Sequence, residues 1–231
     1  MSQRENLFRP IHKGIRSMIY ELGLRLGTTD FANVEESDEL ARQLKKDLSL
    51  SVSNCILCLL AAHSQHEEKD FFAAVEPLDP EVVQEMLNEH RVIARRVQDV
   101  AKACDELTGI SDPERRVELG DRIHLDVSDL FVSYLSHLNN EEALMVPVMW
   151  EHFTDEQLRS LRAQFYNQIP LPRFEEWMRW TLPALNPAEL LVLLSGMRTD
   201  PPPNRFEDAL RIAQEMLPPR RWSSVELELR R

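Results

Sequence analysis

The chain has 231 residues and a formal net charge of −12 at pH 7, which argues against a nucleic-acid-binding surface. Its length suits one large domain or a domain with an appendage, and its longest apolar runs, near residues 55–62 and 190–194, are too short to span a bilayer. Three Cys and a polar start without a cleavable apolar stretch favour reduced thiols, so we expect a cytoplasmic protein.

Helical periodicity dominates the first two thirds of the chain. Gly27 and Gly109 are typical C-terminal caps, and the sequences Asp79-Pro80 and Ser111-Asp-Pro113-Glu114 are typical of helix starts. Pro147 falls inside the last of these helices, where we expect a kink or an early end. Four long helices joined by short turns predict an all-α, antiparallel up-down four-helix bundle. The predicted helices cover residues 11–26, 36–75, 79–107 and 111–150.

Beyond residue 153 the predicted helices become shorter, because Pro residues separate them. We therefore expect a four-helix bundle over residues 1–152 and an α-helical C-terminal extension over residues 153–231. Residues 222–231 are expected to be loose. The sequence Trp177-Met-Arg-Trp180 favours a core or an oligomer contact over a cofactor site. The helices expected in the extension cover residues 154–167, 173–182, 188–197 and 206–217.

One motif occurs twice. The pattern His-x-x-x-Glu-Glu begins at His63 and again at His137. Residues four apart share a helix face, so each imidazole and the carboxylate after it, Glu67 or Glu141, can point toward the same place. A third His-x-x-x-Glu begins at His152, but a capping box starts a new helix between its members and indicates a chance match.

A further His precedes each copy at a similar distance. His12 lies 51 residues before His63, and His90 lies 47 residues before His137. At about 1.5 Å per residue, the four imidazoles fall in one layer of an antiparallel bundle. An unpaired imidazole or carboxylate facing inward costs on the order of a few kcal/mol, so either a metal ion or a buried hydrogen-bond network has to compensate. The candidate metal ligands are His12, His63, Glu67, His90, His137 and Glu141.

These motifs resemble those of the hemerythrin-like, or HHE cation-binding, family, over about residues 1–152. The resemblance implies a four-helix bundle with a non-haem di-iron centre. The matching segments are His12-Lys-Gly-Ile, His63-x-x-x-Glu67-Glu-Lys-Asp-Phe-Phe72, Glu89-His90-Arg and His137-x-x-x-Glu141-Glu-Ala-Leu-Met-Val-Pro147.

The resemblance also implies roles for the candidate ligands. The equivalent of Glu67 commonly bridges the two irons, and the other carboxylate bridges or caps. By this resemblance His12 and His63 would serve one iron, and His90, His137 and Glu141 the other.

One position departs from the oxygen-carrying members that this chain resembles. They have a further His four residues after the third motif, where this chain has Ala94. The resemblance therefore implies a more open centre and weakens the case for reversible oxygen transport. Water or one of four nearby side chains could complete the coordination. Helix phase favours a surface position for Glu68, His66 and Glu142. It favours a core or second-layer position for His124.

Bridged His and carboxylate ligands suit a pair of octahedral irons, whereas structural zinc prefers four closed ligands, often Cys. We therefore expect two Fe ions, with zinc or another divalent metal as a substitute. The expected function is to bind or sense O2, NO, peroxide or iron, without transport of O2. Two alternatives stay open: a di-iron oxidoreductase acting on peroxide or O2, and a structural or partner-binding bundle stabilised by metal. Catalysis and a homo-oligomer also stay open.

Overall fold

The computed structural model describes residues 4–45, 56–199 and 203–229. These residues form helices and turns and contain no strand, so the all-α prediction is confirmed. No helix among the described residues is long and apolar enough to cross a membrane. The helices of the first two thirds are α1 (Arg9–Thr28), α2 (Val34–Lys45), α3 (Ile56–Glu67), η1 (Glu68–Phe72), α4 (Ala73–Val75), α5 (Pro80–Thr108), α6 (Pro113–Asn140), η2 (Glu141–Met145) and α7 (Val146–His152).

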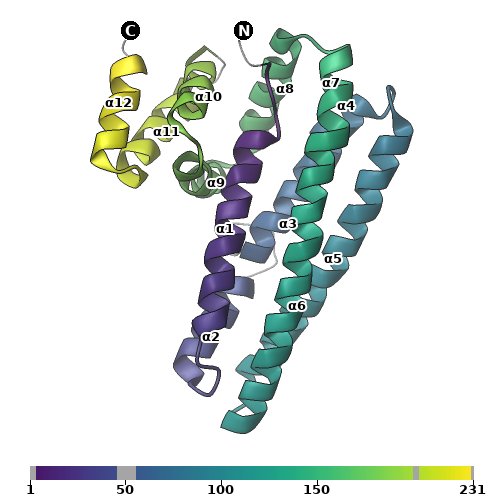
Figure 1. Ribbon diagram of the computed structural model, residues 1–231, viewed down its shortest axis with the longest axis vertical. Helices are drawn as coiled ribbons and strands as arrows, with labels where there is room; N and C mark the ends of the chain where they lie inside the picture. Colours follow the sequence, from purple (N-terminus) through teal and green to yellow (C-terminus); the bar gives the residue numbers. More distant parts are fainter. Residues whose placement is uncertain (1–3, 46–55, 200–202, 230–231) are drawn as a thin grey trace.

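The long helices run alongside one another in alternating directions (Figure 1). The chain descends through α1, rises through α2 and α3, descends through α5 and rises again through α6 and α7. The predicted starts of α5 and α6 are confirmed, because Asp79 and Asp112 accept hydrogen bonds from the backbone N–H groups of Val82 and Arg115. Gly109 caps α5 as predicted, whereas α1 continues through Gly27 to Thr28.

The single helix expected over residues 36–75 is described as α2 and α3, which follow one another along the same side of the bundle. Residues 46–55 between them lie outside the described part of the chain, and so does the side chain of Cys58. Cys104 on α5 is a buried free cysteine. After Glu67 the helix loosens into the π-helical turn η1 before it resumes as α4. The sequence pattern gave no signal for this turn.

A second π-helical turn, η2, replaces the kink or early end that was expected at Pro147. Proline has no N–H to donate to the residue one turn earlier. Here Pro147 falls in the first turn of α7, directly after η2, where a helix tolerates the missing donor. The helix therefore continues to His152. Both π-helical turns lie at the predicted ligands, since η1 follows Glu67 and η2 begins at Glu141.

The start of α6 lies at the lower end of the bundle in Figure 1, and Arg116 lies in its first turn. Its side chain is fully buried at the start of α6. The guanidinium donates to the backbone carbonyls of Phe31, Leu107 and Ile110 and to the carboxylate of Asp38 at 2.6 Å. One side chain thus binds the α1–α2 turn, α2 and the α5–α6 turn together.

The C-terminal extension packs beside α1 and also consists of helices (Figure 1). Helix α9 crosses α1 closely, and a Cβ added at Gly14 would lie 2.9 Å from the backbone of Thr181. The prediction that residues 222–231 are loose is wrong for the described part, because α12 buries Val225 and Leu229 and ends at Leu229. The helices of the extension are α8 (Asp155–Gln168), α9 (Leu171–Ala184), α10 (Pro187–Thr199), α11 (Pro203–Met216) and α12 (Pro219–Leu229).

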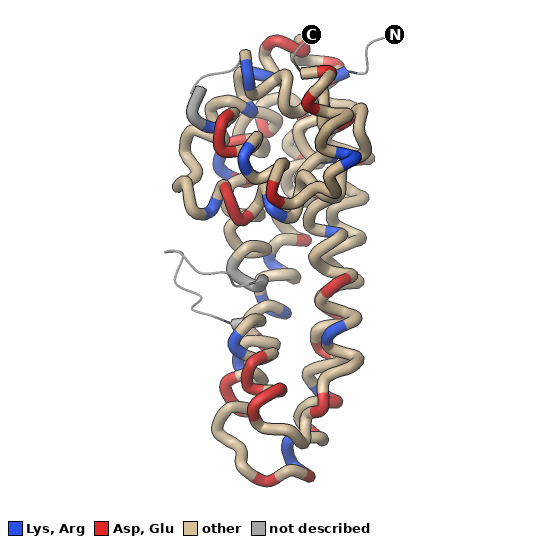
Figure 2. The backbone as a smooth tube through the Cα atoms, turned by 90° about the vertical axis from the view of Figure 1, so that its left-hand side faces the viewer, with Lys and Arg blue, Asp and Glu red and all other residues tan. Residues whose placement is uncertain are grey.

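Charged residues of both signs are interspersed along the described backbone (Figure 2). Lys and Arg alternate with Asp and Glu both on the bundle and on the extension.

Candidate metal centre

The fold brings all six predicted ligands together in one buried layer. They come from α1, α3, α5, α6 and η2, and none is more than 4% exposed. Two overlapping groups of four satisfy the spacing of a metal site, because the ligand atoms within each group lie within 4.8 Å of one another. One group holds His12 and His63, the other holds His90 and His137, and Glu67 and Glu141 belong to both.

Glu67 turns one oxygen toward each side of the centre. Its Oε1 lies 3.1 Å from Nε2 of His63 and 3.6 Å from Nε2 of His12. Its Oε2 lies 3.8 Å from Nε2 of His90. A carboxylate with its two oxygens directed to different nitrogen groups has the geometry of a bridge between two ions.

Glu141 is also placed between the two sides. Its Oε2 lies 3.3 Å from Nε2 of His12 and 3.4 Å from Nε2 of His137. The resemblance had grouped Glu141 with His90 and His137 only, whereas the structure puts it within reach of both halves. The two Nε2 atoms of His90 and His137 lie 2.9 Å apart and face the same point.

Most of these polar atoms have no hydrogen-bond partner among the described residues. The unpartnered atoms include Nε2 of His12, both ring nitrogens of His63, and all four carboxylate oxygens of Glu67 and Glu141. Buried polar groups are normally satisfied, and leaving them unpaired is costly. Donors on opposite sides of one ion lie up to about 4.4 Å apart, because metal–ligand bonds are roughly 2.2 Å. The six residues therefore fit two cations.

Burial also changes the protonation of the centre. It raises the pKa of Glu67 and of Glu141 to about 8. It lowers the pKa of His63 well below its usual value and that of His90, together with the charge of His137, to about 3. The neutral imidazole is the form that binds metal, so His63 and His90 are ready as ligands. The carboxyls require a nearby cation to be ionised at neutral pH.

Three of the four imidazoles are held from behind by a carboxylate. Nδ1 of His12 lies 3.0 Å from Glu142, Nδ1 of His90 lies 2.7 Å from Glu68, and Nδ1 of His137 lies 2.8 Å from Glu89. Such hydrogen bonds fix the tautomer and direct Nε2 toward the metal. These carboxylates are the functional residues that sequence reasoning missed as partners of the ligands. Their signal was adjacency, since each is next in sequence to a ligand: Glu68, Glu89 and Glu142.

The predictions for the flanking residues are partly wrong. Glu142 was expected at the surface, but it is half-buried between His12 and Arg16. Burial acts to raise its pKa, but hydrogen bonds from His12 and Arg16 outweigh burial and lower the pKa to about 2. Glu68 is exposed as expected, yet its carboxylate reaches His90.

Three other polar residues, His66, His124 and Tyr134, belong to neither group of possible ligands. His66 is half-buried against the rings of Phe165 and Trp177, and His124 is exposed rather than in the core. Tyr134 is buried beside His137, but its hydroxyl donates to the backbone carbonyl of Leu60 at 3.1 Å.

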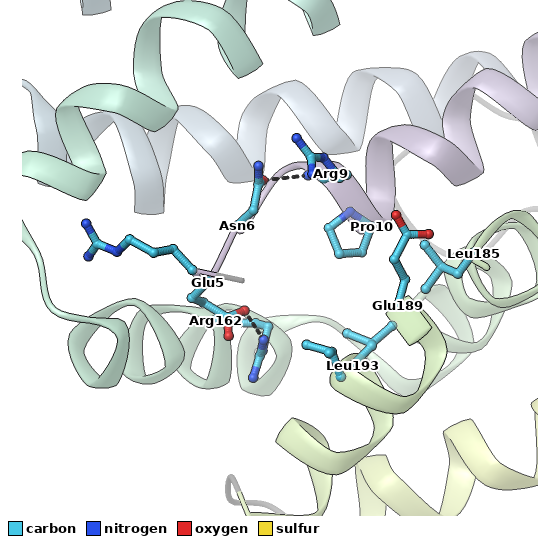
Figure 3. A pocket seen from close by; sticks show the side chains of 10 residues that line it. Glu5, Asn6, Arg9, Pro10, Arg162, Leu185, Glu189 and Leu193 are labelled. Atoms are coloured by element: carbon cyan, nitrogen blue, oxygen red, sulfur yellow. Dashed lines mark hydrogen bonds and ion pairs between the residues drawn. The ribbon is translucent and has the colours of Figure 1, made fainter. Parts of the chain in front are cut away.

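A separate pocket of about 60 Å³ lies between the N-terminal segment, α8 and α10 (Figure 3). Arg162 points toward Glu5, with which it forms an ion pair. Glu189 pairs with Lys13 at 2.6 Å. These contacts join the extension to the residues around the start of α1.

Comparison with known proteins agrees with this geometry. A family model described as the hemerythrin HHE cation binding domain matches residues 5–149. A BRUTUS-like zinc finger protein of Arabidopsis thaliana is 24% identical over 185 residues, which cover 79% of this chain. The chain spans only 14% of the length of that relative. No solved structure matches significantly.

Proposed function

The chain belongs to the hemerythrin HHE cation-binding domain family, and from this premise we propose that it holds two iron ions in the centre described above. The ligands would be the two groups of four that share Glu67 and Glu141. The observation that carries the proposal is this shared pair, since two carboxylates common to two histidine pairs match a bridged two-ion centre and not two independent sites.

Each residue has a defined part in this proposal. His12 and His63 would bind one ion through nitrogen, and His90 and His137 the other. Glu67 and Glu141 would bridge the ions and supply two negative charges that offset part of the positive charge brought into the core. The buried apolar residues around the layer, such as Phe72, whose ring stacks on His90 at 5.1 Å, would exclude bulk water.

Iron suits this ligand set better than zinc. Imidazole with carboxylate is a common environment of non-haem iron, and bridging leaves each ion short of six protein ligands. The described centre contains no Cys, which structural zinc sites often use. Zinc or another divalent ion would act as a substitute.

We further propose that the protein binds or senses O2, NO, peroxide or iron itself. Bound iron would supply the redox chemistry and the open coordination positions for a small ligand. The position at which oxygen carriers have a fifth imidazole is Ala94, which is exposed on α5. The lack of this fifth imidazole favours sensing over reversible transport of O2.

Metal analysis of freshly purified protein tests the proposal. We expect close to two irons per chain and near-ultraviolet absorption from bridged ferric iron. Colourless protein that carries only one zinc per chain would contradict the di-iron assignment. Turnover of hydrogen peroxide would favour an oxidoreductase instead, and stability lost on chelation without any ligand effect would favour a structural role.

A further inference from the structure

The carboxylates behind the histidines follow one rule around the bundle. Glu68 follows Glu67 in sequence and binds His90 on the next helix. Glu89 precedes His90 and binds His137, again on the next helix. Glu142 follows Glu141 and binds His12 on α1 in the same way. Three of the four segments that supply ligands therefore also orient a ligand on the neighbouring helix.

The rule fails at one place, which is His63. The residue that would orient it should flank His12 on α1, and the two candidates are Ile11 and Lys13. Neither has a carboxylate, and Lys13 is engaged by Glu189 of α10 at 2.6 Å. Accordingly Nδ1 of His63 has no hydrogen-bond partner among the described residues.

An aromatic ring from the extension occupies this gap. The ring of Trp177 on α9 meets the ring of His63 edge to face, with centroids 5.8 Å apart and planes at 80°. Trp177 is only 4% exposed and stacks on Phe165 of α8, which holds the indole in place. Edge-to-face packing of this kind restricts rotation of the imidazole ring about its Cβ–Cγ bond.

Helix α9 is close enough to do this because α1 carries a glycine there. Gly14 lies two residues after His12, and a Cβ at this position would come within 2.9 Å of the backbone of Thr181. Thr181 lies one turn after Trp177, so the same close crossing brings the indole to His63. The ion pair of Lys13 with Glu189 adds a second link between α1 and the extension.

We propose that Trp177 is the positioning residue for His63, so that the C-terminal extension completes the metal centre. The inference rests on the proposed two-ion function and goes beyond it. Three imidazoles are fixed by the bundle itself, and the fourth is fixed only when α9 is docked. The ion bound by His12 and His63 therefore depends on the extension, whereas the ion bound by His90 and His137 does not.

Competition with a chelator tests this dependence in the full-length protein. The wild-type protein and the variants are loaded anaerobically with Co2+, and metal release is followed by the visible absorption of bound Co2+. In Trp177→Phe we expect one of two ions to be released at an about 10-fold lower chelator concentration, with the other unchanged. Trp177→Ala should show a larger shift of the same single step, because Phe keeps part of the ring contact.

Trp222→Phe on α12 is the matched control, and it should release both ions as the wild type does. The positions of the visible absorption bands of bound Co2+ report the arrangement of its ligands and do not depend on affinity. These bands should shift in Trp177→Phe and should match the wild type in Trp222→Phe. Circular dichroism of the metal-free forms checks that each variant is folded.

The outcomes of the competition experiment distinguish a failure of the positioning role from a failure of the proposed function. If Trp177→Phe releases both ions as the wild type does, or shifts both steps equally, the positioning role is wrong. If the wild type itself holds fewer than two ions, the proposed function fails and the inference fails with it. A single step that shifts only in the Trp177 variants supports both.

Discussion

At the scale of single residues, the centre places imidazole and carboxyl groups together in a buried layer, where water does not solvate them. Glu67 and Glu141 lie in the dry interior, and burial raises the pKa of each to about 8. Without a cation these carboxyls keep their protons at neutral pH. Binding of metal must therefore displace protons, and the metal-free protein must respond to alkaline pH.

The variant Glu67→Gln separates these two effects. A buried carboxyl with a raised pKa contributes stability that is present below its unfolded value of 4.5 and is lost as pH rises through about 8. Because Gln stays neutral, the metal-free variant should melt at a higher temperature than the metal-free wild type at pH 8.5, with a smaller difference at pH 5. The same variant should lose metal binding.

Glu76→Gln is the control for this experiment, because Glu76 is an exposed carboxylate just beyond α4. Its melting temperature should track that of the wild type at both pH values. Parallel loss of stability in wild type and Glu67→Gln between pH 5 and pH 8.5 would contradict the assignment of a buried neutral acid.

Glu89 should act through His137. Its carboxylate accepts hydrogen bonds from Nδ1 of His137 at 2.8 Å and from Asn140 at 2.6 Å. In Glu89→Gln the charge that favours the metal-binding tautomer is lost, so we expect metal affinity to fall about 10- to 100-fold. Glu85→Gln, one turn earlier on the exposed face of α5, should bind metal normally when both are measured by chelator competition. Equal affinities in the two variants would remove Glu89 from the centre.

At the scale of elements, the same residue type has opposite consequences at two positions of α1. Gly14 allows α9 to approach, whereas a Cβ at Gly23 would meet no atom within 4 Å. Gly14→Ala must push backbone against backbone and should cost about 1–3 kcal/mol. Gly23→Ala should stabilise the helix by up to about 1 kcal/mol. Urea denaturation of both variants measures the difference, and a stable Gly14→Ala protein would mean that the α1–α9 crossing is loose.

Several features of the helices were predicted correctly from the sequence. Helix starts at Asp79 and Asp112 followed from capping residues, and the convergence of the six candidate ligands in one layer followed from helical spacing. The π-helical turns could not be predicted, because each covers only 5 residues, too few for its shift in the phase of the hydrophobic pattern to be recognised. The carboxylates behind the histidines were missed for another reason, since their partners lie on neighbouring helices and depend on packing. Helix α12 was missed because a short segment next to the end of the sequence was expected to be loose, although Val225 and Leu229 are buried on one face.

At the scale of the whole molecule, metal binding should contribute directly to stability, because the unfolded chain cannot assemble ligands from several helices. At free metal 100 times the dissociation constant, a single bound ion adds about 2.7 kcal/mol. For a chain of this size that corresponds to a rise in melting temperature of roughly 5–10 °C. Scanning calorimetry with Fe2+ and with chelator measures the rise, and identical melting curves would contradict metal binding to the folded state.

Arg116 should stabilise the molecule independently of the metal. Its guanidinium donates to three backbone carbonyls and to Asp38, so Arg116→Met should cost on the order of 3 kcal/mol in the free energy of unfolding. The neighbouring Arg115 is exposed, and Arg115→Met should change stability little. Chemical denaturation of the metal-free proteins measures both. A matching loss in the two variants would show that Arg116 does not hold the lower end.

The distance between the arginine and the ligands has a wider consequence. Arg116 and His137 lie on the same helix, 21 residues or about 30 Å apart. The end that Arg116 secures uses no ligand atom, so we expect the chain to keep its shape when its ions leave. Under the proposed function, ions could then leave the centre and bind again without unfolding of the chain. The proportion of filled chains would follow the supply of the metal around them.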